Sequence, residues 1–167
     1  QKLTDEFDYV IVAVGTHKPR RIQFPGSQKV LTALEFLKSA KSDAHAKVGR
    51  EVVIIGAGPG GLEAARVAAE RGHHVVVLEA AAQPGGQIRL TAQSPRRTEM
   101  LSIIDWRMAQ CQAKEVEFKF NTWAEADDVK ALSPDVVIVA TGGMPDIDVL
   151  SHGNELAVSS WDILSGD

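Results

Sequence analysis

Residues 52–78 hold the pattern that most constrains the fold. Val52–Ile55 is a short apolar run, residues 56–61 are rich in glycine, Leu62–Arg71 is rich in alanine and closes at Gly72, and Val75–Leu78 is a second apolar run. Short apolar runs with β-branched residues predict buried strands, and the alanine-rich stretch predicts a helix between them. Because such a helix crosses back over the sheet, the two strands are expected to be parallel.

The rest of the chain repeats this alternation of strands and helices. Further strands are predicted at Asp8–Gly15, Val116–Phe120 and Val136–Ala140, and helical spacing of apolar residues predicts helices at Val30–Lys41 and Glu99–Gln112. Alternating elements of this kind predict an α/β fold, a Rossmann-like doubly wound parallel sheet with helices on both faces.

Two segments of the chain echo one another. Residues 8–15 read DYVIVAVG and residues 135–142 read DVVIVATG, and each is soon followed by a proline. Any buried parallel strand could give such a likeness, or the two could be copies of one crossover strand. We expect Val136–Ala140 to lie beside Val52–Ile55, which leaves residues 8–14 to pair at an edge of this sheet or with a second copy of the chain, as a homo-oligomer.

A polar stretch of small residues from Ser42 to Gly49 indicates a boundary. Residues 1–49 are therefore expected to form a crossover strand, a helix and a linker, and residues 50–167 a nucleotide-binding unit argued below. The early strand, reached without a leader, suggests a piece of a larger enzyme.

Composition excludes several classes of function. The 167 residues carry a formal charge of -4, which gives no basic excess for a nucleic acid partner. No run approaches the roughly 18 apolar residues of a membrane helix. The single cysteine, Cys111, excludes an internal disulfide, a CxxC pair and a cysteine-bound metal centre within the chain, and it favours a cytoplasmic location. No metal site is predicted, because His73 and His74 lack ligands at suitable spacing.

The glycine-rich segment GAGPGG matches the pattern G-x-G-x-x-G at Gly56, Gly58 and Gly61, with Pro59 and Gly60 between the last two. The first glycine allows a tight turn out of the strand, the second lets the backbone approach a pyrophosphate, and the third lets the helix pack close to the sheet. The helix that follows directs its free N–H groups and its positive dipole end at the phosphates. The strand before and the helix after make this pattern specific.

Glu79 ends the second strand of the unit, 18 residues after Gly61, and Ala80 follows it. That offset is close to the ~20 residues at which a carboxylate accepts hydrogen bonds from an adenosine ribose. Since a carboxylate would repel a 2′-phosphate, FAD or NAD(H) is favoured over NADP(H). The alternative to a nucleotide site is that residues 56–61 form an ordinary glycine turn and that Glu79 is a solvated residue at the end of a strand. Pro84-Gly85-Gly86-Gln87, shortly after, is either a surface turn or a second contact to the same ligand.

From Arg50 to about Asp167 the chain resembles the adenine-dinucleotide-binding domain of flavoproteins related to Old Yellow Enzyme, a group that includes 2,4-dienoyl-CoA reductase and the trimethylamine, dimethylamine and histamine dehydrogenases. The segments that carry the resemblance are the glycine loop with its flanking strands, PGGQIRL, VIVATGGMP and SSWDILSGD. The resemblance implies binding of FAD, or of ADP alone as in the amine dehydrogenases. The residues expected to contact the cofactor are Gly56, Gly58, Pro59, Gly60, Gly61, Glu79, Ala80, Gly86, Gln87, Thr141 and Gly142.

The first 49 residues look more like the crossover into the NAD(P)H domain of enzymes of the glutamate synthase small-subunit type. In those enzymes the following glycine loop binds the nicotinamide cofactor, so NAD(H) is the alternative ligand. The leading hypothesis is a dinucleotide-binding part of a flavin- and nicotinamide-dependent oxidoreductase, with other domains of the parent flavoenzyme as partners. A non-catalytic module that holds ADP is the alternative. No nucleophile or acid–base pair can be assigned, so the catalytic residues are unknown and the isolated chain is not expected to be catalytically complete.

Overall fold

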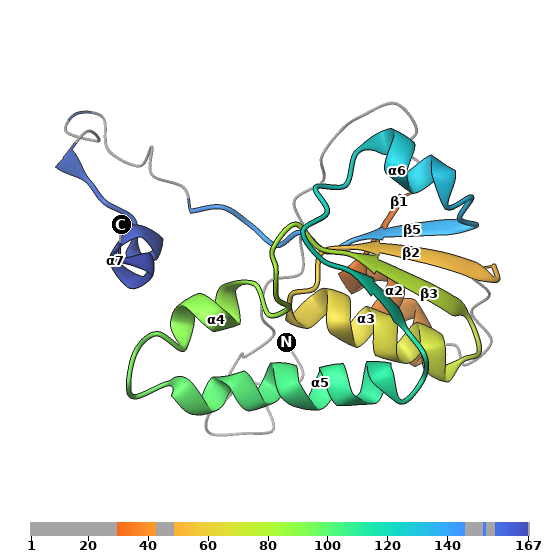
Figure 1. Cartoon of the computed structure of the whole chain (residues 1–167), viewed down its shortest axis with the longest axis horizontal. Helices are drawn as coiled ribbons and strands as arrows, with labels where there is room; N and C mark the ends of the chain where they lie inside the picture. The colour runs from red at the N-terminus through yellow and green to blue at the C-terminus, as the bar shows by residue number, and fades with distance from the viewer. Residues whose placement is uncertain (1–29, 43–48, 146–151, 153–155, 167) are drawn as a thin grey trace, which may run out of the picture.

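The computed structural model describes residues 30–42, 49–145, 152 and 156–166. Five parallel strands form one sheet in the order β1-β5-β2-β3-β4 (Figure 1). Their bounds are Val30–Thr32 for β1, Glu51–Ile55 for β2, His74–Leu78 for β3, Glu117–Lys119 for β4 and Val136–Val139 for β5. The predicted place of residues 136–140 beside Val52–Ile55 is confirmed by the pairing of β5 with β2.

Helices cover both faces of this sheet (Figure 1). The helical elements of the described residues are α2 (Ala33–Ser42), α3 (Pro59–Glu70), α4 (Gln87–Thr91), the 3-10 helix η2 (Thr98–Leu101), α5 (Ser102–Gln112), α6 (Ala126–Ala131) and α7 (Ser160–Ser165). On one face α2, α3 and α5 bury Ile54, Val77 and Ile138 of the central strands. On the other, Val129 and Leu132, at the end of α6, pack against Val53 and Val76. The predicted Rossmann-like α/β fold is confirmed.

The helix predicted at Val30–Lys41 begins three residues later than expected. Residues 30–32 form β1, which pairs with β5, so a short apolar run that fitted helical spacing instead extends the sheet. The helix begins at Ala33 because Thr32 caps it: the Thr32 hydroxyl accepts from the Glu35 N–H at 3.3 Å, and the Glu35 carboxylate accepts from the Thr32 N–H at 3.1 Å. Strand β1 thus belongs to the same sheet as the strands of residues 49–145. The position of a domain boundary near residue 49 stays a prediction.

Helix α3 begins earlier than the expected Leu62 and ends at Glu70, one residue before the expected Arg71. It starts at Pro59, because proline suits the first helical position. At its end the N–H of Gly72 donates to Ala69 and the N–H of His73 donates to Ala68, with Gly72 at a φ of +84°, which is a Schellman motif.

Other boundaries differ in smaller ways. The strand predicted at 116–120 spans Glu117–Lys119, and the helix predicted from Glu99 divides into η2 and α5. The short helices α4, α6 and α7 were not predicted, because five or six residues give too little periodicity. The predicted strand at residues 8–15, and with it the proposed pairing of copies through residues 8–14, lies outside the described residues. No helix in the described segments is both long and apolar enough to cross a membrane.

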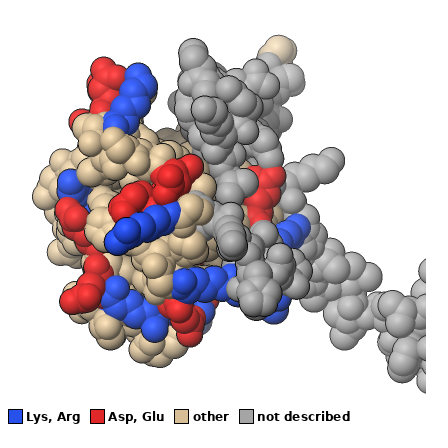
Figure 2. All heavy atoms as spheres, turned by 90° about the vertical axis from the view of Figure 1, so that its right-hand side faces the viewer, with Lys and Arg blue, Asp and Glu red and all other residues tan. Residues whose placement is uncertain are grey.

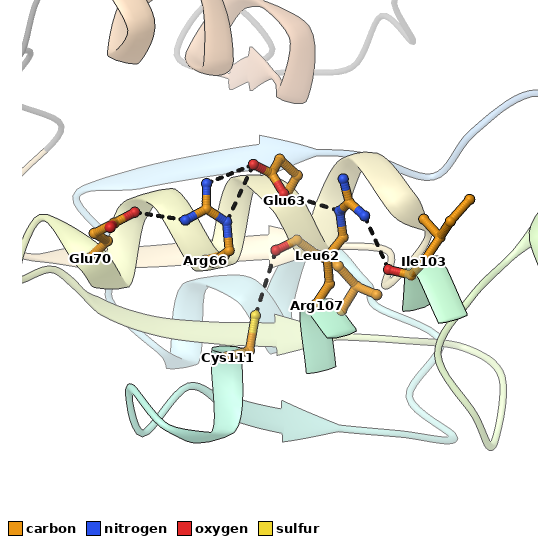
Figure 3. Close-up of polar contacts among 7 residues, drawn as sticks. All are labelled: Leu62, Glu63, Arg66, Glu70, Ile103, Arg107 and Cys111. Atoms are coloured by element: carbon orange, nitrogen blue, oxygen red, sulfur yellow. Dashed lines mark hydrogen bonds and ion pairs between the residues drawn. The ribbon is translucent and has the colours of Figure 1, made fainter. Parts of the chain in front are cut away.

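An ion-pair network joins α3 to α5 on the outside of the sheet (Figure 3). The Glu63 carboxylate accepts from Arg66 at 2.7 Å and pairs with Arg107 of α5 at 3.0 Å. The hydrogen bond from Arg66 is the main cause that holds the pKa of Glu63 below its usual value. Nearby, the buried Cys111 thiol lies 3.5 Å from the carbonyl oxygen of Leu62, and burial raises its pKa to about 11. This network fixes the helix that carries the glycine loop.

Charges of both signs are interspersed on the side of the molecule at which the strands begin. Figure 2 shows Lys and Arg beside Asp and Glu across this side rather than a patch of one sign. At the start of the strands His74 of β3 lies 2.6 Å from Glu51 of β2, and within β4 Lys119 lies 3.5 Å from Glu117. Among the described residues visible on this side, the charges do not form the uniform positive stripe that is typical of nucleic acid binding.

Candidate functional site

The candidate site lies at the carboxyl ends of the central strands. From β2 the chain continues to β3 and β4 on one side, and it later returns as β5 on the other side of β2. The loops after β2 and β5 therefore lie at the topological switch point of the sheet, which is where open α/β sheets bind ligands. The predicted site residues follow β2, β3 and β5, so all of them are brought to this edge.

The glycine loop packs tightly against the end of β5. Gly56 has a φ of +101°, and a Cβ there would lie 2.6 Å from the carbonyl oxygen of Ala140. A Cβ at Gly61 would overlap the carbonyl oxygen of Gly56 and contact the Ala140 side chain at 3.2 Å. Neither position accepts a side chain, so the first and last glycines of the motif serve the close approach of α3 to the sheet.

The middle glycine, Gly58, differs because the space that a Cβ would occupy there is empty. Gly58 is the N-cap of α3 with a φ of -71°, and a Cβ there would meet no atom within 4 Å. Pro59 and the exposed Gly60 begin the helix. The N–H groups of the first turn, among them those of Gly60 and Gly61, have no acceptor within the helix. Open backbone in front of a helix N-terminus is the arrangement that receives a pyrophosphate.

Glu79 is fixed beside this loop through both of its carboxylate oxygens. One accepts from the Ala57 N–H at 2.6 Å and the other from the Ala81 N–H at 2.8 Å. Each oxygen keeps a second lone pair for a further donor. The side chain is half-buried and the next residue, Ala80, is exposed, so the carboxylate stands between the glycine loop and solvent.

A second turn closes on the glycine loop from the side. The Gly85 N–H donates to the Ala57 carbonyl at 2.8 Å, and a Cβ on Gly86 would lie 3.4 Å from the Gly58 Cα. The Gln87 side chain then donates from Nε2 to the Gly143 carbonyl at 3.0 Å. The turn after β3 therefore bridges the loop after β2 and the loop after β5.

The structure thus gathers every predicted site residue at one edge of the sheet. Thr141 and Gly142 are exposed directly after β5, and a Cβ on Gly142 would lie 3.6 Å from Gln87 Nε2. Sequence reasoning missed the main-chain groups of Ala57, Ala81 and Gly143, because a backbone donor or acceptor leaves no mark on residue type. Across the described ranges, no group of three or more His, Cys, Asp or Glu side chains could hold a metal ion.

Comparison with known proteins places this site in a family. The family model for pyridine nucleotide-disulphide oxidoreductase matches residues 1–164. The chain belongs to the pyridine nucleotide-disulphide oxidoreductase family. Because that match runs through the glycine loop and the strand ends, this domain is a dinucleotide-binding domain of the kind found in flavoprotein oxidoreductases.

Individual relatives agree with the predicted resemblance. A probable N-methylproline demethylase of Rhizobium meliloti (strain 1021) is 68% identical over 75% of this chain and 19% of its own length. A multifunctional alkene reductase/demethylase OYE of Caballeronia cordobensis is 46% identical over 70% of this chain and 17% of its own. A solved 2-naphthoyl-CoA reductase complex has a TM-score of 0.62 and 38% identity over 72% of this chain and 18% of its own. The likeness to Old Yellow Enzyme-related flavoproteins is confirmed. This chain spans about a fifth of the length of these relatives.

Proposed function

We propose that this oxidoreductase domain binds the ADP portion of FAD, or ADP itself, at the carboxyl ends of β2 and β3. The observation that carries the proposal is the pairing of an open backbone at Gly58 with a carboxylate at Glu79, joined by the Ala57 hydrogen bond. These two groups suit the pyrophosphate and the adenosine ribose, respectively.

The side chains and the backbone of the domain then have distinct roles in nucleotide binding. The first turn of α3 binds the pyrophosphate through its N–H groups, and the Glu79 carboxylate accepts from the ribose hydroxyls. The rest of a dinucleotide would extend past the residues beside the glycine loop, which are Gly86, Gln87, Thr141 and Gly142. A bound flavin would supply the electron transfer, so the residues of this domain bind and orient.

The parent protein is proposed to be a flavin- and nicotinamide-dependent oxidoreductase. The support is that relatives of this kind are several times longer than the chain, so substrate and acceptor sites would lie in other domains. A cytoplasmic location stays a prediction that rests on the single cysteine.

NAD(H) is the second candidate ligand. The observation in its favour is that the family match includes residues 1–49, the segment that resembles a crossover into a nicotinamide-binding domain. Since FAD, ADP and NAD(H) share the ADP group, all three make the same contacts with the glycine loop and Glu79.

The deciding experiment identifies the nucleotide. Protein purified without added nucleotide is heated, and the released compounds are separated by chromatography; release of FAD or ADP supports the proposal, and release of NAD selects the second candidate. If nothing is released, titration calorimetry with FAD, ADP and NAD⁺ ranks the three ligands. Failure of all of them to bind would overturn the proposal.

Two glycine variants test the site itself. Gly58→Ala adds a methyl group that meets no atom of the protein, so it is expected to leave the melting temperature unchanged while it weakens ADP binding at least tenfold, about 1.4 kcal/mol. Gly60→Ala is the matched control, because its Cβ makes only an ordinary contact of 3.9 Å with Ala33 and binding should be retained. Equal affinity in both variants would contradict the assignment of the pyrophosphate to Gly58.

A further inference from the structure

Trp123 is a large aromatic side chain that stands in solvent close to Glu79. It is 79% exposed, more than Trp106 at 52%. It lies in the segment between β4 and α6, which passes the carboxyl end of the sheet (Figure 1).

Main-chain hydrogen bonds hold this segment against the turn that carries Glu79. The Glu79 N–H donates to the Lys119 carbonyl, and the Thr122 N–H donates to the Glu79 carbonyl, both at 2.9 Å. The Asn121 N–H donates to the Ala81 carbonyl at 3.1 Å. Since Trp123 directly follows Thr122, its Cα is about 3.8 Å from the Thr122 Cα, so the backbone of Trp123 lies beside the turn that carries Glu79.

The backbone is anchored on both sides of Trp123. On its other side Trp123 adjoins Ala124, which packs against the core cluster formed by Val53, Val76 and Leu78. The turn after β3 carries only small side chains, because residues 80–82 are three exposed alanines. An exposed aromatic residue therefore lies on an anchored segment whose backbone is hydrogen-bonded to Glu79, the residue to which the proposed function gives the ribose.

We propose that Trp123 stacks on the adenine base of the bound nucleotide and gives the site a preference for purine bases. This proposal rests on the proposed function, because Glu79 must hold the adenosine ribose for the attached base to reach β4. A base stacked on an indole buries apolar surface on both partners, and such stacking commonly changes affinity by about 1–3 kcal/mol, roughly 5- to 150-fold. The alternative is that the indole contacts another part of a longer protein, and the test distinguishes this contact from stacking on adenine.

The first test compares ADP with UDP, which share the ribose and the diphosphate and differ in the base. For Trp123→Ala, calorimetry should show a loss of ADP affinity of at least about fivefold and a smaller loss for UDP, while Trp123→Phe retains most of the ADP affinity. Trp106→Phe, on α5, is the matched control and should bind ADP as the wild type does. Thermal unfolding checks that the exposed position tolerates each change.

The second test uses the fluorescence of Trp123 itself. The chain has three tryptophans, so Trp106→Phe combined with Trp161→Phe leaves Trp123 as the only one. Saturating ADP should quench this emission, because the adenine would lie against the ring.

The outcomes separate the two proposals. A wild-type protein that binds ADP, with unchanged affinity in Trp123→Ala and unchanged emission in the double variant, overturns the stacking alone and leaves the indole to a protein contact. A wild-type protein that binds neither ADP nor FAD nor NAD⁺ overturns the stacking together with the proposed function.

Discussion

The carboxylate of Glu79 accepts a hydrogen bond from the main-chain N–H of Ala57 at 2.6 Å. This bond connects the end of β3 to the loop after β2, so the two chemical features of the site cannot move independently. The second oxygen is held by the Ala81 N–H at 2.8 Å, which fixes the plane of the carboxylate. The orientation of the carboxylate that we propose to bind the ribose is thus set by the protein itself.

Glu79→Gln is expected to weaken nucleotide binding and to loosen the loop. The amide keeps one acceptor oxygen, but its NH₂ group would face one of the two N–H donors. We expect ADP affinity to fall about tenfold or more, since hydrogen bonds to charged groups contribute about 1.5–3 kcal/mol, with a loss of about 1 kcal/mol in the free energy of unfolding. Calorimetry and urea unfolding measure the two effects. Glu99→Gln, at an exposed residue of η2, is the control; equal affinity in both variants would refute the role of Glu79.

Gly61→Ala is expected to damage the fold rather than the ligand contact. The added Cβ would overlap the carbonyl oxygen of Gly56, which is a backbone atom in the loop after β2, so α3 would have to shift away from that loop. We expect a loss of at least about 2 kcal/mol in the free energy of unfolding. Gly60→Ala, one residue earlier, should cost nothing measurable. The two urea unfolding midpoints decide the matter, and a Gly61→Ala protein as stable as Gly60→Ala would show that the close approach is unimportant.

Glu63→Gln tests the network between α3 and α5. Loss of the charge leaves Arg66 and Arg107 without their shared carboxylate, and we expect a cost of about 1–2 kcal/mol at pH 7. Because the folded pKa of Glu63 is lowered, its stabilisation is present above the unfolded pKa and is lost as pH falls through the folded value. The difference between wild type and variant should therefore shrink in acid.

The comparison variant for this network is Asp127→Asn. Asp127 pairs with Lys130 at 2.9 Å on the exposed surface of α6, where an ion pair contributes little. Urea unfolding at neutral and acidic pH compares the two. A pH-independent effect of Glu63→Gln would indicate lost packing instead of lost charge.

The buried thiol of Cys111 leads us to expect that the free energy of unfolding falls at alkaline pH. Burial raises the pKa of the thiol to about 11, above its value in the unfolded chain, so folding favours the protonated form. The contribution is complete below the unfolded pKa of about 8.5 and declines as pH rises toward 11, by up to about 3 kcal/mol. Cys111→Ala should lose less stability between pH 8 and pH 10.5 than wild type. Parallel curves in the two proteins would refute this assignment.

Several features could be predicted from particular residues. The spacing of Gly56, Gly58 and Gly61 between two apolar runs, with Glu79 after the second, gave the βαβ unit and the ends of its strands. The apolar residues of 136–140 indicated a central strand. By contrast, Val30–Thr32 fitted a helix by periodicity and became β1, because the free edge of β5 offers main-chain partners that a short pattern does not reveal.

The sequence by itself determined which strands are buried, where the glycine loop turns and which carboxylate follows the second strand, because glycine geometry and apolar periodicity are local properties. Only the tertiary structure decided that Glu79 meets the N–H of Ala57, that the Gly85–Gln87 turn bridges two loops, and that the segment before Trp123 is hydrogen-bonded to Glu79. Those relationships run through main-chain hydrogen bonds between segments distant in the chain. Backbone donors and acceptors are the same in every residue except proline, so their pairing is fixed by the packing of the sheet.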